Sequence, residues 1–249
     1  MKALTLILFI FLLSISSQAK VIRIGGLIHI PPYFHKLDDT GIELDILKAS
    51  FSKIGYDEVL TVFASNKRAI QLLMNDNIDT LVSNAKDISL SNNKKVFSSV
   101  EILDFVDCAI TLKSSNLEIK KTADLKDKAI WAFSGAREAL GNEFFNITKN
   151  NKLYKESINQ LTQPRALMKN RIDIAVSDIN IFSHQAKLEG YNKSDFIFTS
   201  ISPKTPRSLR FKNKKLRDLF NRGLKLIRKD GTYRKILKKY NDHYRASCG

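Results

Sequence analysis

Short apolar, β-branched runs alternate with helical patterns along most of the chain. The expected strands are Val21–Ile28, Val59–Phe63, Ile78–Val82, Ala129–Phe133 and Ile172–Ser177. The expected helices are one through Leu44 and Ile54 that ends at Gly55, one that carries Ile70, Leu73 and Met74, one over Arg137–Phe145 and one near Arg165–Lys169. This alternation is typical of βαβ units with a mostly parallel sheet. A polar stretch interrupts it after the third strand, so the pattern predicts two α/β units.

Two amphipathic helices are expected near the C-terminus. Their apolar stripes are Leu216, Leu219, Phe220, Leu224 and Ile227 in one, and Tyr233, Ile236, Leu237 and Tyr240 in the other. Asp230-Gly231 separates them, because glycine supplies a helix stop. The stripes need a partner surface, which we expect to be one of the α/β units.

Each α/β unit contains a similar succession of helix, turn and strand. Arg68-Ala69-Ile70 leads to Asn77-Ile78-Asp79 in the first unit, and Arg165-Ala166-Leu167 leads to Arg171-Ile172-Asp173 in the second. We expect Asp79 and Asp173 to organise each turn by accepting hydrogen bonds from local backbone amides. Asn84 and Asp178 follow five residues later, at the strand ends. Ligands of open α/β sheets bind outside the carboxyl ends of the strands, so Asn84 and Asp178 are predicted to face a shared cleft.

The N-terminal residues have the pattern of a cleavable secretory signal peptide. Lys2 precedes an apolar run from Leu6 to Leu13, and Ser17 and Ala19 are small residues at the usual positions before a cleavage site. The run is far shorter than the roughly 20 apolar residues that cross a bilayer. We expect residues 1–19 to be removed by cleavage after Ala19, and the mature chain to be soluble and periplasmic. A retained membrane anchor is the less favoured alternative.

The chain is strongly basic, with a formal net charge of +16 that is densest between Arg207 and Arg245. Such a charge attracts anions in general. The lysines follow amphipathic helices without an aromatic platform for bases, which argues against a nucleic-acid partner. A solvated basic face is therefore the expected arrangement.

The chain has two cysteines, Cys108 and Cys248. An oxidising compartment permits a bridge between them, but their geometry decides whether it forms. The sequence leaves the pairing open. A bridge would be expected to pin the C-terminal tail to the first unit.

The order and spacing of several motifs resemble the bacterial extracellular solute-binding proteins of family 3, which include periplasmic amino-acid-binding proteins. The motifs of the first unit are Ile30-Pro31-Pro32-Tyr33-Phe34, Gly41-Ile42-Glu43-Leu44-Asp45 and Asn77-Ile78-Asp79. Those of the second are Ala123-Asp124-Leu125-Lys126-Asp127-Lys128, Ser134-Gly135 and Arg171-Ile172-Asp173 through Asp178, and the final helix begins at Asp230-Gly231-Thr232-Tyr233. The resemblance covers nearly the whole mature chain.

This resemblance implies the two-lobed α/β fold of type II periplasmic binding proteins, in which each lobe is a mostly parallel sheet flanked by helices. Residues 20–108 and 207–249 would form a discontinuous first lobe, and residues 109–206 a continuous second lobe. Two hinge strands, near Ala109–Lys113 and Pro206–Phe211, would join them. The implied function is capture of a small molecule between the lobes by hinge closure, for uptake by the permease of an ABC transporter.

Binding of an α-amino acid requires a cation with amide donors for the carboxylate and an acid for the ammonium group. By the resemblance, Asp178 matches the family's ammonium-binding acid, and a helix N-cap is its alternative role. Ser134, Gly135 and Ala136 lie between a strand and a helix, where free amides favour an anion, and Arg137 adds a guanidinium. These four residues are the predicted carboxylate site, although Arg137 has the alternative of an exposed surface arginine.

Three further residues complete the predicted ligand site. Tyr33 and Phe34 follow a strand and a Pro-Pro pair, so one ring is expected to wall the pocket and the other to lie in the core. Arg68 resembles an arginine found in a subgroup of the family, with a solvated side chain as its alternative.

The stretch Ser89–Lys95 lacks the arginine that usually binds the ligand carboxylate in the family, and Lys94 has no bidentate fork. The expected ligand is therefore a small polar or anionic, amino-acid-like solute.

Catalytic patterns are mostly absent from the sequence. There is no Gly-x-Ser-x-Gly elbow or phosphate loop, and Gly25-Gly26 falls short of a dinucleotide fingerprint. His29, His35, His184 and His243 are scattered along the chain without metal-ligand spacing. We expect a monomeric binding protein without cofactor, metal or catalytic residues. Two alternatives remain: a cyclohexadienyl dehydratase-like enzyme with Glu138 or Asp178 as its acid or base, and a sensory module that presents its closed form to a receptor.

Overall fold

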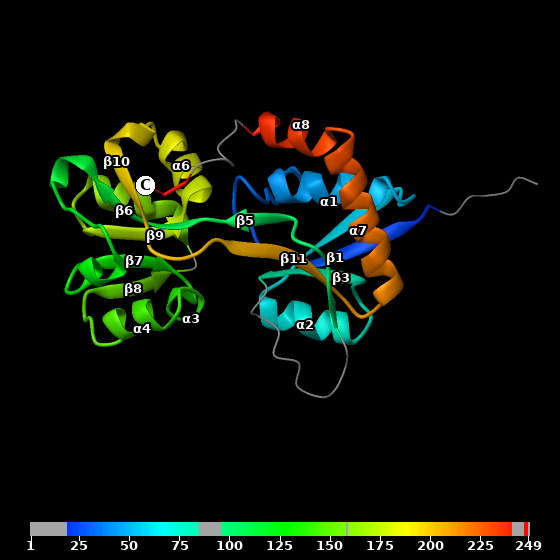
Figure 1. Cartoon of the computed structure of the whole chain (residues 1–249), viewed down its shortest axis with the longest axis horizontal. Coiled ribbons are helices and arrows are strands. Elements are labelled where there is room, and N and C mark those ends of the chain that lie inside the picture. The colour runs from blue at the N-terminus through cyan, green and yellow to red at the C-terminus, as the bar shows by residue number, and fades with distance from the viewer. Residues whose placement is uncertain (1–18, 85–95, 158, 241–246, 249) are drawn as a thin grey trace, which may run out of the picture.

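The computed structural model describes residues 19–84, 96–157, 159–240 and 247–248. The predicted signal peptide apart from Ala19, the stretch Ser89–Lys95 and His243 lie outside the described residues. Two sheets lie side by side, and helices cover both faces of each (Figure 1). In the part of the chain that is described, no helix is long and apolar enough to cross a membrane.

The first sheet has the strand order β2-β1-β3-β11-β4, and β5 also pairs with β11. Its strands are β1 (Val21–Leu27), β2 (Glu58–Phe63), β3 (Thr80–Asn84), β4 (Phe97–Ser98), β5 (Leu103–Phe105) and β11 (Thr205–Phe211). The strands β2, β1 and β3 are parallel, whereas β11 runs antiparallel to its neighbours. The sheet is therefore mixed.

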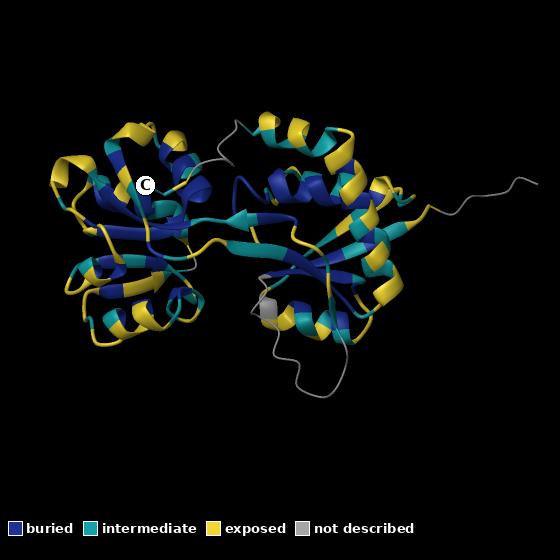
Figure 2. Ribbon diagram, viewed as in Figure 1, coloured by how far each residue is buried: buried dark blue, intermediate teal, exposed yellow. Residues whose placement is uncertain are grey.

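Four helices cover the first sheet, and together they form the first lobe: α1 (Ile42–Ser52), α2 (Asn66–Met74), α7 (Lys214–Lys229) and α8 (Thr232–Lys239). Helices α1, α7 and α8 share one core with the sheet, which includes Phe51, Phe211 and Phe220. Helix α2 packs on a second cluster, through Ala69 and Leu73. Figure 1 shows these two groups on opposite faces of the sheet, and Figure 2 shows the buried residues between the layers. The two C-terminal helices thus cover the first sheet.

The second sheet has the order β10-β6-β9-β7-β8. Its strands are β6 (Asp107–Leu112), β7 (Ile130–Phe133), β8 (Tyr154–Ser157), β9 (Ile174–Asp178) and β10 (Phe196–Ser200). Helices α3 (Ala136–Ala139), α4 (Asn142–Thr148), α5 (Gln163–Met168) and α6 (Ile179–Leu188) complete the second lobe, with short 3-10 turns at Lys113–Ser115, Thr122–Leu125, Gln160–Thr162 and Lys193–Asp195. The strands β9, β7 and β8 are parallel, and β6 and β10 are antiparallel additions.

The chain crosses between the two sheets at two places. One crossing is at Val106, between β5 and β6, and the other is at 201–204, between β10 and β11. The strands beside the crossings pair with each other, Phe105 with Thr205. The expected hinge ranges therefore lie in β11 and in β6 with the turn residue Lys113 after it, and each crossing lies a few residues earlier in the chain.

Cys108 and Cys248 form a disulfide, with their Cα atoms 5.8 Å apart. Cys108 lies in β6, so the bridge attaches the C-terminal segment to the second sheet and not to the first unit as expected. The preceding helix, α8, packs on the first lobe. The end of the chain is thus fixed to both lobes.

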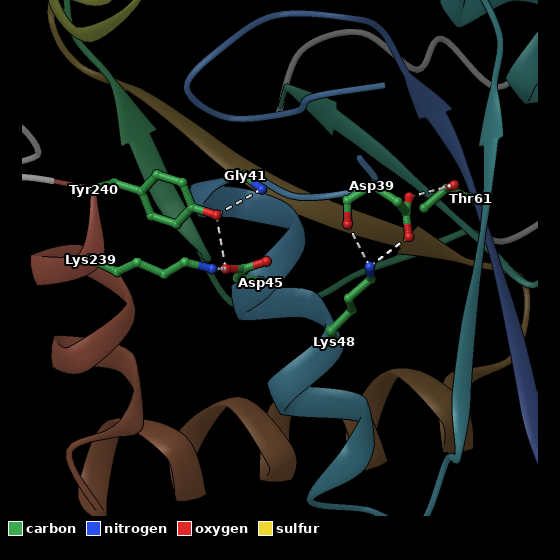
Figure 3. Close-up of polar contacts among 7 residues, drawn as sticks. All are labelled: Asp39, Gly41, Asp45, Lys48, Thr61, Lys239 and Tyr240. Atoms are coloured by element: carbon green, nitrogen blue, oxygen red, sulfur yellow. Dashed lines mark hydrogen bonds and ion pairs between the residues drawn. The ribbon is translucent and has the colours of Figure 1, made fainter. Parts of the chain in front are cut away.

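Tyr240 fixes the end of α8 to the beginning of α1 (Figure 3). Its hydroxyl accepts a hydrogen bond from the Gly41 amide and donates one to Asp45, each 2.9 Å long. Lys239 forms an ion pair with the same carboxylate at 2.8 Å. In Figure 3, Asp39 also binds Lys48 and Thr61 beside this contact.

Two local expectations from the sequence were wrong. The helix expected over Arg137–Phe145 is divided into α3 and α4, because Gly141 between them has a φ of 90°, outside the helical region. Asp79 accepts a hydrogen bond from the amide of Arg23 in β1, and Asp173 accepts one from the amide of Ala129 just before β7, so neither is held by a local amide. The two carboxylates therefore join strand to strand at equivalent places in the two sheets.

Candidate ligand-binding site

Asp178 lies at the carboxyl end of β9 and is almost completely buried. Its Oδ1 accepts hydrogen bonds from the amides of Asn180 and Ile181 and from the Tyr33 hydroxyl, and its Oδ2 accepts one from the Val106 amide. Burial raises the pKa of Asp178 to about 6, although these hydrogen bonds oppose the rise. The N-cap role considered from the sequence is therefore present.

Asp107 is a second buried carboxyl group, directly opposite Asp178 in the β6–β9 pairing. Burial raises the pKa of Asp107 to about 8, and the charge of Asp178 adds to the effect. The two facing carboxyl groups thus retain about one proton between them at neutral pH. The sequence analysis missed Asp107, although an aspartate within the apolar run Phe105–Ile110 was a usable signal.

Tyr33 connects the two lobes. It follows β1 in the first lobe, and its hydroxyl donates to Asp178 at 3.1 Å and accepts a hydrogen bond from Asn180 at 2.9 Å. Ile181 of α6 also packs in the core of the first lobe. The Tyr33 and Phe34 rings are both fully buried, so neither is exposed as a pocket wall in this conformation.

The segment Ser134–Arg137 follows β7, as expected, but two of its amides bind a carboxylate of the chain itself. Gly135 and Arg137 donate their amides to the two oxygens of Glu156 in β8, at 2.7 and 3.1 Å. Burial raises the pKa of Glu156, but hydrogen bonds from Tyr154, Gly135 and Arg137 outweigh it and hold the pKa below its ordinary value. Glu156 was not foreseen, because only the strand pairing of β7 and β8 brings it here.

The Arg137 guanidinium is also occupied within the second lobe. It donates to the hydroxyl and carbonyl oxygens of Thr148, at the end of α4, and lies 4.3 Å from the centre of the Tyr154 ring. A cation at the C-terminus of a helix is favourable. Arg137 and Asp178 thus have separate sets of partners, and the structure does not bring them into contact.

Four predicted residues remain to be placed. Arg68 is exposed at the beginning of α2, with Gln71 as a neighbour at 3.5 Å. Ser134 is exposed and Ala136 is buried. Asn84 ends β3 and pairs with Arg207 of β11, and its side chain lies outside the described part.

Three histidine rings lie close together, two from the first lobe and one from the second. The His35 ring lies 6.2 Å from the His29 ring and 5.6 Å from that of His184 in α6, measured between centres. Within the ranges described, no group of three or more His, Cys, Asp or Glu side chains is arranged to hold a metal ion.

Two surface hollows lie away from the carboxyl ends of the parallel strands. One is lined by Asp39, Lys48, Tyr56 and Asp57 of the first lobe. The other is lined by Leu112, Lys128, Asn170 and Asp173 of the second lobe. Neither includes a predicted ligand-binding residue.

The arrangement of two mixed sheets joined by two crossings is that of a type II periplasmic binding protein. A model of the "Bacterial extracellular solute-binding proteins, family 3" matches residues 22–243. The chain therefore belongs to this family, as its motifs predicted. No curated protein sequence matches the chain.

Solved structures share the fold at low sequence identity. A substrate-binding protein of an ABC uptake transporter from Streptococcus pneumoniae with bound histidine has a TM-score of 0.68 and 21% identity, covering 89% of this chain and 92% of that one. An ancestral arginine-binding protein bound to arginine has a TM-score of 0.64 and 22% identity, and the match covers 89% of this chain and 98% of that one. A histidine kinase sensor domain with similarity to periplasmic binding proteins has a TM-score of 0.69 and 15% identity, and the match covers 90% of this chain and 96% of that one. The chain therefore shares its fold with both transport proteins and a sensor.

Proposed function

We propose that the chain is an exported, periplasmic solute-binding protein that captures a small polar, amino-acid-like solute between its two lobes. The observation that carries this proposal is the contact of Tyr33, after β1, with Asp178, at the end of β9. This contact brings the carboxyl ends of strands from both sheets to one region, where open α/β sheets bind their ligands. Membership of the solute-binding family supports the same role.

Within this proposal, the predicted residues divide by exposure. Arg68 and Ser134 are exposed, and are proposed to reach the solute directly. Tyr33, Phe34, Ala136 and Asp178 are buried, and are proposed to shape the site from behind. Gly135 and Arg137 contribute through the Glu156 contact, which fixes the loop after β7.

The proposed mechanism is closure of the lobes about the crossings at Val106 and 201–204. A ligand favours the closed form only by binding it more tightly than the open form. A monomer in the closed form would then be recognised by the permease of an ABC transporter, in keeping with rigid-body closure around ligands in other two-domain binding proteins. The signal peptide over residues 1–19 would direct the export.

Thermal melting against a panel of amino acids, organic acids and amines tests the proposal. A ligand at 100 times its Kd stabilises the folded state by about 2.7 kcal/mol, so one chemical group of the panel should raise the melting temperature clearly. A flat panel contradicts capture of such solutes. Product formation from prephenate or arogenate would instead favour the enzyme alternative.

Arg68→Ala should weaken binding of the stabilising solute about 10- to 100-fold, because a hydrogen bond to a charged group contributes roughly 1.5–3 kcal/mol. Titration calorimetry measures the change. The matched control is Arg171→Ala, which removes an exposed arginine just before the amino end of β9, and it should bind like the wild type. Equal affinities in all three proteins would remove Arg68 from the site.

A further inference from the structure

The positive charge of the chain is concentrated on α7 and α8. Residues 214–239 hold eleven lysines and arginines against two aspartates, a net charge of +9 out of +16 for the whole chain. The proposed solute site uses none of these residues. The charge therefore calls for a separate explanation.

Four of these cations form a row along α7, here named the basic stripe: Lys215, Arg222, Lys225 and Lys229. At 100° per residue they fall within an arc of about 80°, and the row is about 21 Å long. All four residues are exposed. The opposite face of α7 buries Phe220, Leu224 and Ile227 against the first lobe. The helix thus presents one apolar face to the core and one cationic face to the outside.

The basic stripe does not contribute to the contacts that hold the fold together. Among the described residues, none of its four side chains has a hydrogen bond, an ion pair or a ring contact. Other cations of the same helices do have partners: Lys214 and Arg217 bind Asp218, Arg228 binds the carbonyls of Glu101 and Ile102, and Lys239 binds Asp45 (Figure 3). The stripe is therefore available for an external partner.

The location of α7 leaves the region between the lobes free. Figure 1 shows α7 at the end of the first lobe that is remote from the second sheet, and Figure 2 shows exposed residues along its outer side. Leu226 is the one large apolar residue of α7 that is exposed. A partner on this face would be held by charge, without insertion of apolar side chains.

We propose that the basic stripe docks the protein on a phospholipid surface that carries anionic headgroups. A straight row of unpaired cations is complementary to a flat, negatively charged surface, and each lysine or arginine near such a surface increases binding about fivefold. Since the cations are exposed, salt screens the attraction. Docking through α7 leaves the lobes free to bind a solute.

Sedimentation of the mature chain with vesicles tests this proposal. Binding is expected to vesicles of phosphatidylcholine with phosphatidylglycerol at low salt, and not to phosphatidylcholine alone or at high salt. The variant Lys215→Gln/Arg222→Gln/Lys225→Gln/Lys229→Gln should lose at least about 100-fold in partitioning. Circular dichroism and solute titration should be unchanged, so this result does not depend on the proposed solute site.

The control variant removes the same charge from the second lobe: Lys126→Gln/Lys152→Gln/Lys155→Gln/Lys169→Gln, all at exposed positions. It should retain most of the vesicle binding. An equal loss in both variants would assign the binding to net charge alone. Undiminished vesicle binding by the stripe variant would show that the basic stripe is not the docking site. Binding to a soluble polyanion such as heparin, with none to vesicles, would point to an acidic macromolecule and overturn the proposal.

Discussion

Asp107 and Asp178 face each other across β6 and β9, close to the point where the chain passes between the lobes. The sequence identified Asp178 because it ends a buried strand, where a short polar side chain caps the next helix. Asp107 and Glu156 were missed, because their surroundings depend on which strands pair. Local pattern thus predicts a residue's own turn or cap, but not the partner that lies across a sheet.

Asp107→Asn should stabilise the protein at alkaline pH. The pKa of Asp107 is about 8 in the folded chain, against about 4 when unfolded. Because folding raises the pKa of Asp107, the stability that this group contributes is fully present below about pH 4 and is lost as the pH rises to about 8. The variant has no such loss, so its unfolding free energy near pH 8 should exceed that of the wild type by up to about 5 kcal/mol.

Urea unfolding of both proteins between pH 4 and 9 measures this difference, and the two curves should converge at the acid end. Asp127→Asn is the matched control, because Asp127 is exposed. Identical pH profiles for the wild type and Asp107→Asn would contradict the assigned cause.

Helices α1 and α7 show what an element's sequence encodes and what it leaves out. The apolar stripes predicted the buried faces correctly, including Phe220, Leu224 and Ile227. The expected strands were also found, within about two residues. The short strands β4, β5, β8 and β10 were missed, because a strand such as Tyr154–Ser157 is defined by its neighbour more than by its composition.

Gly223→Ala should destabilise the protein although alanine favours helices by about 1 kcal/mol. A Cβ atom at this position would lie 2.2 Å from the backbone oxygen of Ser50 in α1, so the two helices would have to move apart. We expect a net loss of about 1–3 kcal/mol in unfolding free energy. Chemical denaturation measures it, with the exposed Lys225→Ala as a control expected within about 0.5 kcal/mol of the wild type. An unchanged or raised stability would show that the helices can separate freely.

At the scale of the whole molecule, the two-unit architecture followed from the alternation of strands and helices, and the family followed from its motifs. The mixed character of the sheets could not be predicted from that alternation, because β11 comes late in the chain and inserts beside β3. The disulfide could not be predicted either, because its formation depends on the distance between β6 and the C-terminal segment. The hydrogen bonds from the Gly135 and Arg137 amides to Glu156 also depend on the assembled lobe, because β8 brings Glu156 beside β7.

Reduction of the disulfide should lower the stability of the whole protein. The bridge joins residues separated by 140 positions, and loss of a native bridge typically costs about 2–5 kcal/mol. The melting temperature should fall when dithiothreitol is added to the wild type. Cys248→Ser should melt at the lower temperature with or without dithiothreitol, since the chain has no third cysteine. Identical melting of the oxidised and reduced wild type would contradict a stabilising role.

The pairing of Cys108 with Cys248 also sets an order of events in biogenesis. Cys108 is synthesised 140 residues before Cys248, so the bond must wait until the second cysteine has also left the ribosome. An oxidising environment is required as well, and the cytosol does not provide one. In an exported chain this bond therefore forms only after translocation.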